Sequence, residues 1–304
     1  MLANNNEAII NKLAKNSVKT NKKQYAILFF TIILSAFMLF CVFTIGMTYL
    51  NSSRLQNTRL NGAEYDILTM NGFTSEQLNT LRQNENIRSV GIESYAGFIQ
   101  STEYDKTVEI GLLWCDEVFW DNLMSPARTK LDGHYPQNKN ELMVTKDILK
   151  TCGNENLSVG DSLILTYENN TGVYTDEFVI SGIWDGYGDT SAGFVSKAFY
   201  DETGYDLKKN GILCIKLNCN YVFPTTIQSI EKSLDFSDRQ IFAPTGYIEN
   251  SFKLLLGICG LALVICLSAY LLIYNILYLS VSGKIRYYGL LQSLGMTKKQ
   301  LVHF

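Results

Sequence analysis

The stretch at residues 254–282, LLLGICGLALVICLSAYLLIYNILYLSVS, decides the fold because its 29 residues contain no charged side chain. An α-helix needs about 20 mainly apolar residues to cross a bilayer, so this stretch predicts a transmembrane helix. At about 1.5 Å per residue the helix would be about 43 Å long, against a hydrocarbon core of about 30 Å. We therefore expect residues 251–282 to form a stalk and a transmembrane helix.

A second uncharged run of 26 residues covers residues 25–50. A signal peptide has an apolar region of about 7 to 15 residues and a small-residue cleavage motif, and this run is longer and lacks the motif. It predicts a retained first transmembrane helix, with Tyr25 and Tyr49 at the two membrane interfaces. Residues 1–24 predict a cytoplasmic amphipathic helix, although a basic flank that only sets the topology is an equally good interpretation.

The charge distribution predicts the orientation. Before Tyr25 there are five lysines and one acid, and after Ser282 there are four basic residues and no acid. By the positive-inside rule both ends should be cytoplasmic, in a multi-pass protein of the cell membrane. Residues 51–253 carry 17 Lys and Arg against 28 Asp and Glu, a net charge of 17 − 28 = −11. This acidic, extracytoplasmic middle lacks the basic face of a nucleic-acid-binding protein.

The central region, residues 51–250, predicts an α+β domain with a ferredoxin-like half and a β-rich insertion. Its early part is a β-α-β-β pattern with strands at 64–70, 87–91, 97–101 and 108–114, and a helix that Thr74 and Gln77 begin as a capping box. Its late part is a β-α-β pattern at 212–217, 225–234 and 239–243. We expect both parts to share one sheet, with residues 116–210 as the insertion.

A cationic, amphipathic segment, IRYYGLLQSLGMTKKQ, follows the second span at residues 285–300. Leu290, Leu291 and Leu294 fall on one helical face, which predicts a cytoplasmic helix over residues 283–296. Gly295 is a helix stop, and residues 297–300 form a capping box that begins a further helix over 297–304. The sequence therefore predicts the N-terminal portion of a longer protein.

This segment resembles the cytoplasmic coupling helix of FtsX-like (MacB-type) ABC transporter permeases of Gram-positive bacteria. Tyr287 and Tyr288 stand where many members have an acidic residue. The resemblance implies docking on an ATP-binding subunit through Arg286, Tyr287, Tyr288, Gly289, Leu290, Leu291, Leu294, Gly295, Met296, Lys298 and Lys299. Residues 132–142 and 157–163 are also similar to turns of the MacB periplasmic core domain.

What the resemblance implies is a permease subunit of an ABC transporter complex. It would couple ATP hydrolysis by a separate ATPase to a conformational change of the extracytoplasmic domain, as a homodimer or pseudo-dimer of permease units. The function would be export or extrusion of a peptide, lipid or lipoprotein, or mechanotransmission. The alternative is a two-span membrane sensor or scaffold with an extracytoplasmic ligand-binding domain. A sensor should have a sizeable cytoplasmic signalling domain, which this sequence does not contain.

Motifs of catalysis are missing from the sequence, so we predict no enzyme activity, cofactor or metal site. There is no P-loop motif, and His134 is the only histidine of the central region. Residues 185–189, DGYGD, are typical of a surface turn, and Trp114, Trp120 and Trp184 are typical of a core. Four cysteines of the central region could form one disulfide, and their spacing fits no zinc motif: Cys115, Cys152, Cys214 and Cys219.

Overall fold

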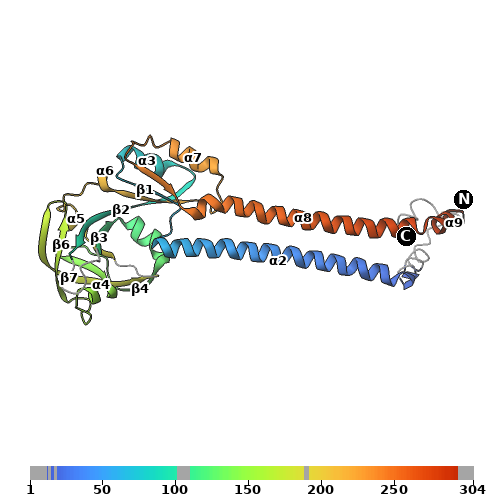
Figure 1. The fold of residues 1–304 in the computed structure, drawn as a ribbon, viewed down its shortest axis with the longest axis horizontal. Coiled ribbons are helices and arrows are strands. Elements are labelled where there is room, and N and C mark those ends of the chain that lie inside the picture. The colour runs from blue at the N-terminus through green and yellow to red at the C-terminus, as the bar shows by residue number, and fades with distance from the viewer. Residues whose placement is uncertain (1–11, 13–14, 17–18, 101–109, 188–191, 294–304) are drawn as a thin grey trace. The chain divides into compact units, whose positions relative to one another are not determined.

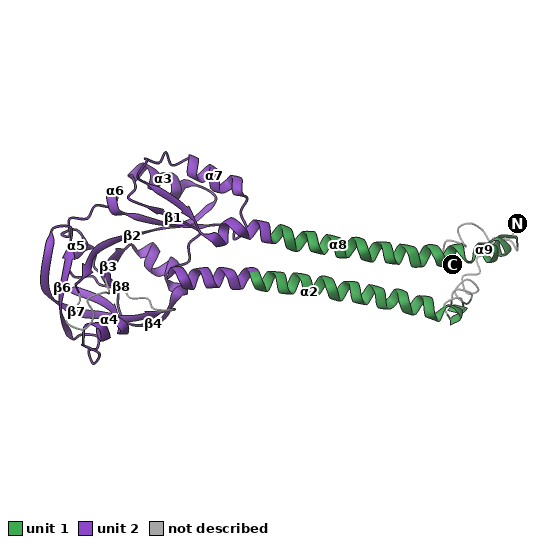
Figure 2. Cartoon of the chain, in the orientation of Figure 1, with its two compact units in different colours: residues 1–49, 255–304 green, residues 50–254 purple. Residues whose placement is uncertain are grey.

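The structure is a computed structural model that describes residues 12, 15–16, 19–100, 110–187 and 192–293. The chain divides into two compact units, one of residues 1–49 and 255–304 and one of residues 50–254 (Figure 2). The predicted helix over residues 1–24 and the predicted helix start at 297–304 lie largely or wholly outside the described residues.

Two long helices contain the uncharged runs: α2 (Lys22–Asn61) and α8 (Gly246–Ser282) (Figure 1). Both are long and apolar enough to cross a membrane. In their most apolar windows, 0% of α2 and 6% of α8 is buried, whereas the core helix of a soluble protein would be mostly buried. The prediction of two apolar helices that flank a mixed domain is confirmed. Helix α2 continues 11 residues past the predicted span, through the mainly polar residues 51–61.

Within the first unit, α2 and α8 contact each other at Gly46. A Cβ atom added there would lie 2.7 Å from Cδ1 of Ile258, so the missing side chain is what permits the close approach. Near the other end of the pair, Ser280 Oγ donates to Gln24 Oε1 at 3.4 Å. A short helix, α9 (Ile285–Ser293), follows α8 directly in the chain.

The second unit contains a ten-stranded sheet in which four strands form the ferredoxin-like part. These strands are β1 (Ile67–Met70), β2 (Ile87–Ile99), β9 (Ile212–Leu217) and β10 (Ile241–Pro244), in the order β10-β1-β9-β2. All their pairings are antiparallel, with Ile67 opposite both Ile215 and Pro244. The prediction that the early and late β-α-β parts share one sheet is confirmed.

Two helices belong to these β-α-β parts: α3 (Ser75–Gln83) and α7 (Pro224–Lys232). The capping box that begins α3 is confirmed, because Thr74 Oγ1 accepts from the Gln77 amide at 3.1 Å and Gln77 Oε1 accepts from the Thr74 amide at 2.9 Å. Leu81 of α3 and Ile230 of α7 are buried in the main hydrophobic core.

Beyond β2 the same sheet continues in the order β3-β8-β5-β7-β4, and β6 pairs with β2 and β7. Strand β3 belongs to the predicted early part, and the other five belong to the predicted insertion. The added strands are β3 (Ile110–Cys115), β4 (Arg128–Gly133), β5 (Glu141–Thr145), β6 (Ser162–Asn169), β7 (Gly172–Gly186) and β8 (Ala192–Val195). The short helices are η1 (Val118–Leu123), η2 (Ser125–Ala127), α4 (Lys146–Thr151), α5 (Lys197–Tyr200) and α6 (Leu207–Asn210).

Residues 87–99 form one strand, so the prediction of separate strands at 87–91 and 97–101 is wrong. The register of β2 against β3 shifts between Tyr95 and Gly97, which is a bulge within a continuous strand. A Cβ atom at Gly97 would lie 2.8 Å from the Glu168 carbonyl oxygen of β6. The glycine therefore permits close backbone approach rather than ending the strand.

The three tryptophans are core residues, as predicted: Trp114, Trp120 and Trp184 are 8%, 7% and 3% exposed. The described part of the 185–189 turn is the end of β7, and residues 188–189 lie outside the described residues. All seven cysteines, each among the described residues, are free thiols.

Candidate coupling site

Helix α9 contains six of the predicted coupling residues: Arg286, Tyr287, Tyr288, Gly289, Leu290 and Leu291. None of its residues is buried, and Leu290 is 63% exposed. A Cβ atom at Gly289 would have no atom within 4 Å, so a neighbour has room to approach the backbone there. The other five predicted residues, Leu294, Gly295, Met296, Lys298 and Lys299, lie outside the described residues.

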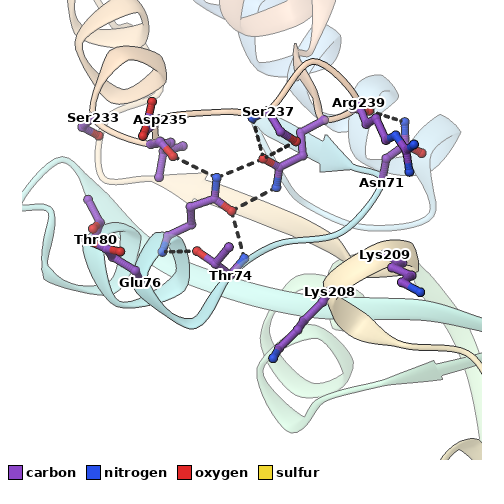
Figure 3. Close-up of a pocket in the computed structure, with 13 residues that line it drawn as sticks. Asn71, Thr74, Glu76, Thr80, Lys208, Lys209, Ser233, Asp235, Ser237 and Arg239 are labelled. Atoms are coloured by element: carbon purple, nitrogen blue, oxygen red, sulfur yellow. Dashed lines mark hydrogen bonds between the residues drawn. The ribbon is translucent and has the colours of Figure 1, made fainter.

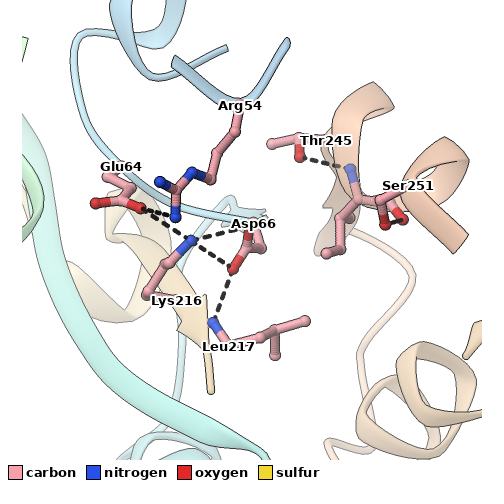
Figure 4. A network of polar contacts seen from close by, with 8 residues as sticks. Arg54, Glu64, Asp66, Lys216, Leu217, Thr245 and Ser251 are labelled. Carbon is pink, nitrogen blue, oxygen red and sulfur yellow. Dashed lines mark hydrogen bonds and ion pairs between the residues drawn. The ribbon is translucent and has the colours of Figure 1, made fainter. Parts of the chain in front are cut away.

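A buried polar network, which the sequence did not predict, lies where α2 leads into the sheet (Figure 4). At its centre is Lys216 of β9, which is 4% exposed. Its Nζ lies 3.2 Å from Glu64 Oε1 and 3.2 Å from Asp66 Oδ2. A buried ammonium group requires such carboxylate partners, because an unpaired charge in the interior is strongly destabilising.

Asp66 connects this network to two segments of the second unit, strand β9 and the residues just before α8. Its Oδ2 accepts from the Leu217 amide at 2.9 Å, its backbone amide donates to the Ile215 carbonyl at 2.8 Å, and its carbonyl accepts from the Thr245 amide at 2.8 Å. The carboxyl is 2% exposed. Burial raises the pKa of Asp66 and the ion pair with Lys216 opposes that rise, so the charged carboxylate depends on Lys216.

Each long helix has one end in the second unit. That end contacts the network in α2 and lies next to it in α8. Arg54 of α2 extends its guanidinium to 4.0 Å from Glu64 Oε1. At the start of α8, Thr245 Oγ1 accepts from the Ile248 amide at 3.4 Å, and the fully buried Ser251 donates to the Ile248 carbonyl at 2.9 Å (Figure 4). Both helix ends thus contact the segment at residues 64–66, which precedes β1 and pairs with Lys216 of β9. The only sequence signal was one lysine in the otherwise apolar strand ILCIKL.

A polar groove of about 730 Å³ lies between the start of α3, helix α6 and the loop before β10 (Figure 3). Gln77 and Gln240 bond each other there, and Gln77 Nε2 donates to the Leu234 carbonyl at 2.8 Å. Gln240 Nε2 also donates to the Gly72 carbonyl at 2.8 Å. Because these two amides satisfy one another and the backbone, they fix the loops and leave little capacity for a ligand.

The titratable groups outside the network and the groove include His134 and the buried carboxyl of Glu93. Within the described ranges, no three His, Cys, Asp or Glu side chains are arranged to hold a metal ion. His134 is exposed, and its Nδ1 lies 3.0 Å from the carbonyl oxygen of Tyr135. Glu93 of β2 is opposite Cys115 of β3, and burial raises its pKa to about 7.

No protein-family model matches the chain, and no curated protein matches it. Three similar solved structures are domains of membrane transport proteins. The periplasmic region of MacB from Actinobacillus actinomycetemcomitans has 12% identity and a TM-score of 0.42, covering 64% of this chain and 95% of that one. A domain of a putative permease from Porphyromonas gingivalis has 9% identity and a TM-score of 0.36, covering 60% and 88%.

The third is the extracellular domain of the noncanonic ABC-type transporter YknZ from Gram-positive bacteria, with 12% identity and a TM-score of 0.38, covering 59% of this chain and 98% of that one.

Proposed function

We propose that this chain is the permease subunit of an ABC transporter complex and couples ATP hydrolysis by a separate ATPase subunit to a conformational change of its extracytoplasmic domain. One observation carries the proposal. Directly after a helix of membrane-spanning length comes a short helix, α9, whose residues resemble the coupling helix of FtsX-like permeases and whose apolar side chains are not buried. Such a helix has an apolar face available to a partner.

The polar network supports the second half of the proposal, transmission into the domain. Helix α8 runs without a break from the residues fixed beside Asp66 through the whole uncharged run. Helix α2 likewise runs through its uncharged stretch to Arg54 and beyond. A displacement of α2 would act on Glu64 through Arg54, and a displacement of α8 would act on Asp66 through the Thr245 amide. Glu64 and Asp66 both pair with Lys216 of β9, so either displacement would reach that strand. The proposal covers export or extrusion of a peptide, lipid or lipoprotein, and mechanotransmission without a cargo.

Binding of the ATPase tests the proposed coupling face. Leu290, Leu291 and Leu294 fall on one face of the helical projection, whereas Ile285 falls on the opposite face. Leu291→Ala in a packed groove should cost about 2 to 5 kcal/mol of binding if the side chain is fully buried there. We expect Leu291→Ala and Gly289→Trp to abolish co-purification of the partner ATPase subunit. Ile285→Ala, which is the matched control, should bind like the wild type.

Adsorption of α9 to lipid is the competing interpretation. It requires apolarity and positive charge but no defined shape. If Leu291→Ala and Gly289→Trp bind the ATPase normally, and only charge reversal at Lys298 and Lys299 has an effect, the segment is a membrane anchor and the docking proposal fails. Membrane insertion should be normal in all the variants, and its loss would point to misfolding.

In the proposed topology, the start of α2 and the end of α8 lie on the cytoplasmic side of the membrane, and the domain lies on the outer side. In a Cys219→Ser background, which removes the exposed native thiol of the domain, cysteines introduced at Asn138 and Asn170 should react with an impermeant reagent in intact cells. A cysteine at Asn16 should react only after permeabilisation. All three positions are exposed, so the reverse labelling pattern would overturn the topology.

A further inference from the structure

An exposed aromatic patch lies beside the start of α8. Phe223, which precedes α7, is 61% exposed, and its ring contacts that of Phe252 in a tilted arrangement, with a centroid distance of 4.3 Å and an angle of 47° between the ring planes. Tyr221 lies two residues before Phe223 and is partly exposed. We define Tyr221, Phe223 and Phe252 as the aromatic patch. Aromatic rings exposed in this way leave apolar surface in contact with water, which is unfavourable unless something covers it.

The sequence around the patch is unusual for this acidic domain. Residues 217–230 form a run of 14 residues without a charge, whereas no other uncharged run between residues 51 and 248 exceeds nine. The domain as a whole carries −11, so this uncharged segment would be repelled less by an anionic surface than an average segment of the domain. A cation, Lys253, immediately follows Phe252.

The position of Phe252 along α8 indicates which surface covers the aromatic patch. Phe252 is two residues before Leu254, where the uncharged run begins, and two residues correspond to about 3 Å along a helix axis. The aromatic patch therefore lies within about one helical turn of the residue at which the uncharged run begins. Aromatic residues are enriched at membrane interfaces because the boundary between headgroups and acyl chains accommodates both their rings and nearby polar groups.

We propose that the aromatic patch inserts into the phospholipid headgroup region beside α8 and so provides the domain with a second membrane contact. Lys253 is placed to pair with a lipid phosphate. Glu231 and Glu249, which line the neighbouring groove with Lys253, limit the depth, because carboxylates do not enter the hydrocarbon core. The inference requires only that α8 crosses a membrane, and it holds whether or not an ATPase binds α9.

Fluorescence quenching by labelled lipid tests the proposal directly. The probe is Phe223→Trp in the full chain, placed in nanodiscs of phosphatidylcholine and phosphatidylglycerol that each hold one copy. The three native tryptophans are buried in the domain, so the wild-type chain gives the background. The matched control is Ile164→Trp on β6, a position that is 66% exposed. We expect lipid brominated near the headgroup to quench the emission that Phe223→Trp adds at least twofold, and to leave the control unchanged.

Each other outcome overturns the proposal. Quenching of the Phe223→Trp probe no stronger than that of the control would mean that lipid does not reach the patch. Shielding that occurs only in nanodiscs with two copies would assign the patch to a second copy of this chain. Strong quenching only by mid-chain bromine would place it in the hydrocarbon core. Because none of these readouts involves an ATPase, a failure here is distinct from a failure of the coupling proposal.

Discussion

Replacing Lys216 by Met removes the charge at the centre of the buried network and keeps an unbranched side chain in its place. Lys216 and Asp66 are 4% and 2% exposed, and Lys216 Nζ lies 3.2 Å from both Asp66 and Glu64. Without Lys216, the Asp66 carboxylate keeps the hydrogen bond from Leu217 but loses its cation. Breaking a buried pair in this way costs about 3–5 kcal/mol, so the free energy of unfolding of the domain should fall by about that amount.

Two further variants make the interpretation specific. Asp66→Asn combined with Lys216→Met removes both charges, and an amide oxygen can still accept from the Leu217 amide, so we expect at least half of the lost stability to return. Lys139→Met is the matched control, because Lys139 pairs with Glu202 on the exposed surface with 58% of its side chain accessible. That exposed pair should contribute less than about 1 kcal/mol.

Tryptophan fluorescence during chemical denaturation of the full chain in detergent is a suitable assay, because all three tryptophans lie in the domain. Its pH dependence is a second test. Burial raises the pKa of Asp66, and the loss of Lys216 should raise it further, so the carboxyl of Lys216→Met becomes neutral as the pH falls. The difference in the free energy of unfolding between Lys216→Met and the wild type should therefore become smaller at acid pH. A deficit no larger than that of Lys139→Met, or a double variant no more stable than the single one, would refute the reasoning.

Two further predictions concern the same domain. Burial raises the pKa of Glu93 to about 7, so between its ordinary pKa of 4.5 and 7 the folded state binds more protons than the unfolded state and stability falls as the pH rises, by about 1–3 kcal/mol. Glu93→Gln should lack this slope when unfolding is compared at pH 5 and 8, and an unchanged slope would contradict the assignment. Gly72 has φ +90° and an added Cβ would overlap the Lys208 carbonyl, whereas Gly62 has φ +70° with open space around it. Gly72→Ala should therefore lose at least about 2 kcal/mol, and Gly62→Ala only about 1 kcal/mol, in the same denaturation assay, and equal losses would contradict the overlap.

The sequence by itself determined the features that depend on local composition. The uncharged runs at 25–50 and 254–282 specify long apolar helices, because hydrocarbon excludes charge and only an internally hydrogen-bonded helix can satisfy the backbone there. The start of α3 also follows from a local signal, since Thr74 and Gln77 satisfy each other's backbone amides within one turn. The leucines and the glycine of α9 lie within ten residues of one another, so an apolar helical face there follows from the same kind of local signal, and its role in coupling stays a prediction.

Only the tertiary structure decided where α2 ends, that β2 is continuous, and which charges are buried together. Residues 51–61 are polar and carry no apolar periodicity that marks a helix, and Gly97 is conspicuous as a strand breaker until the close approach of β6 is known. Lys216 and Asp66 are separated by 150 residues, and nothing near either one indicates the partner. Such pairings are set by the strand order β10-β1-β9-β2, which depends on the packing of the whole sheet rather than on any one segment.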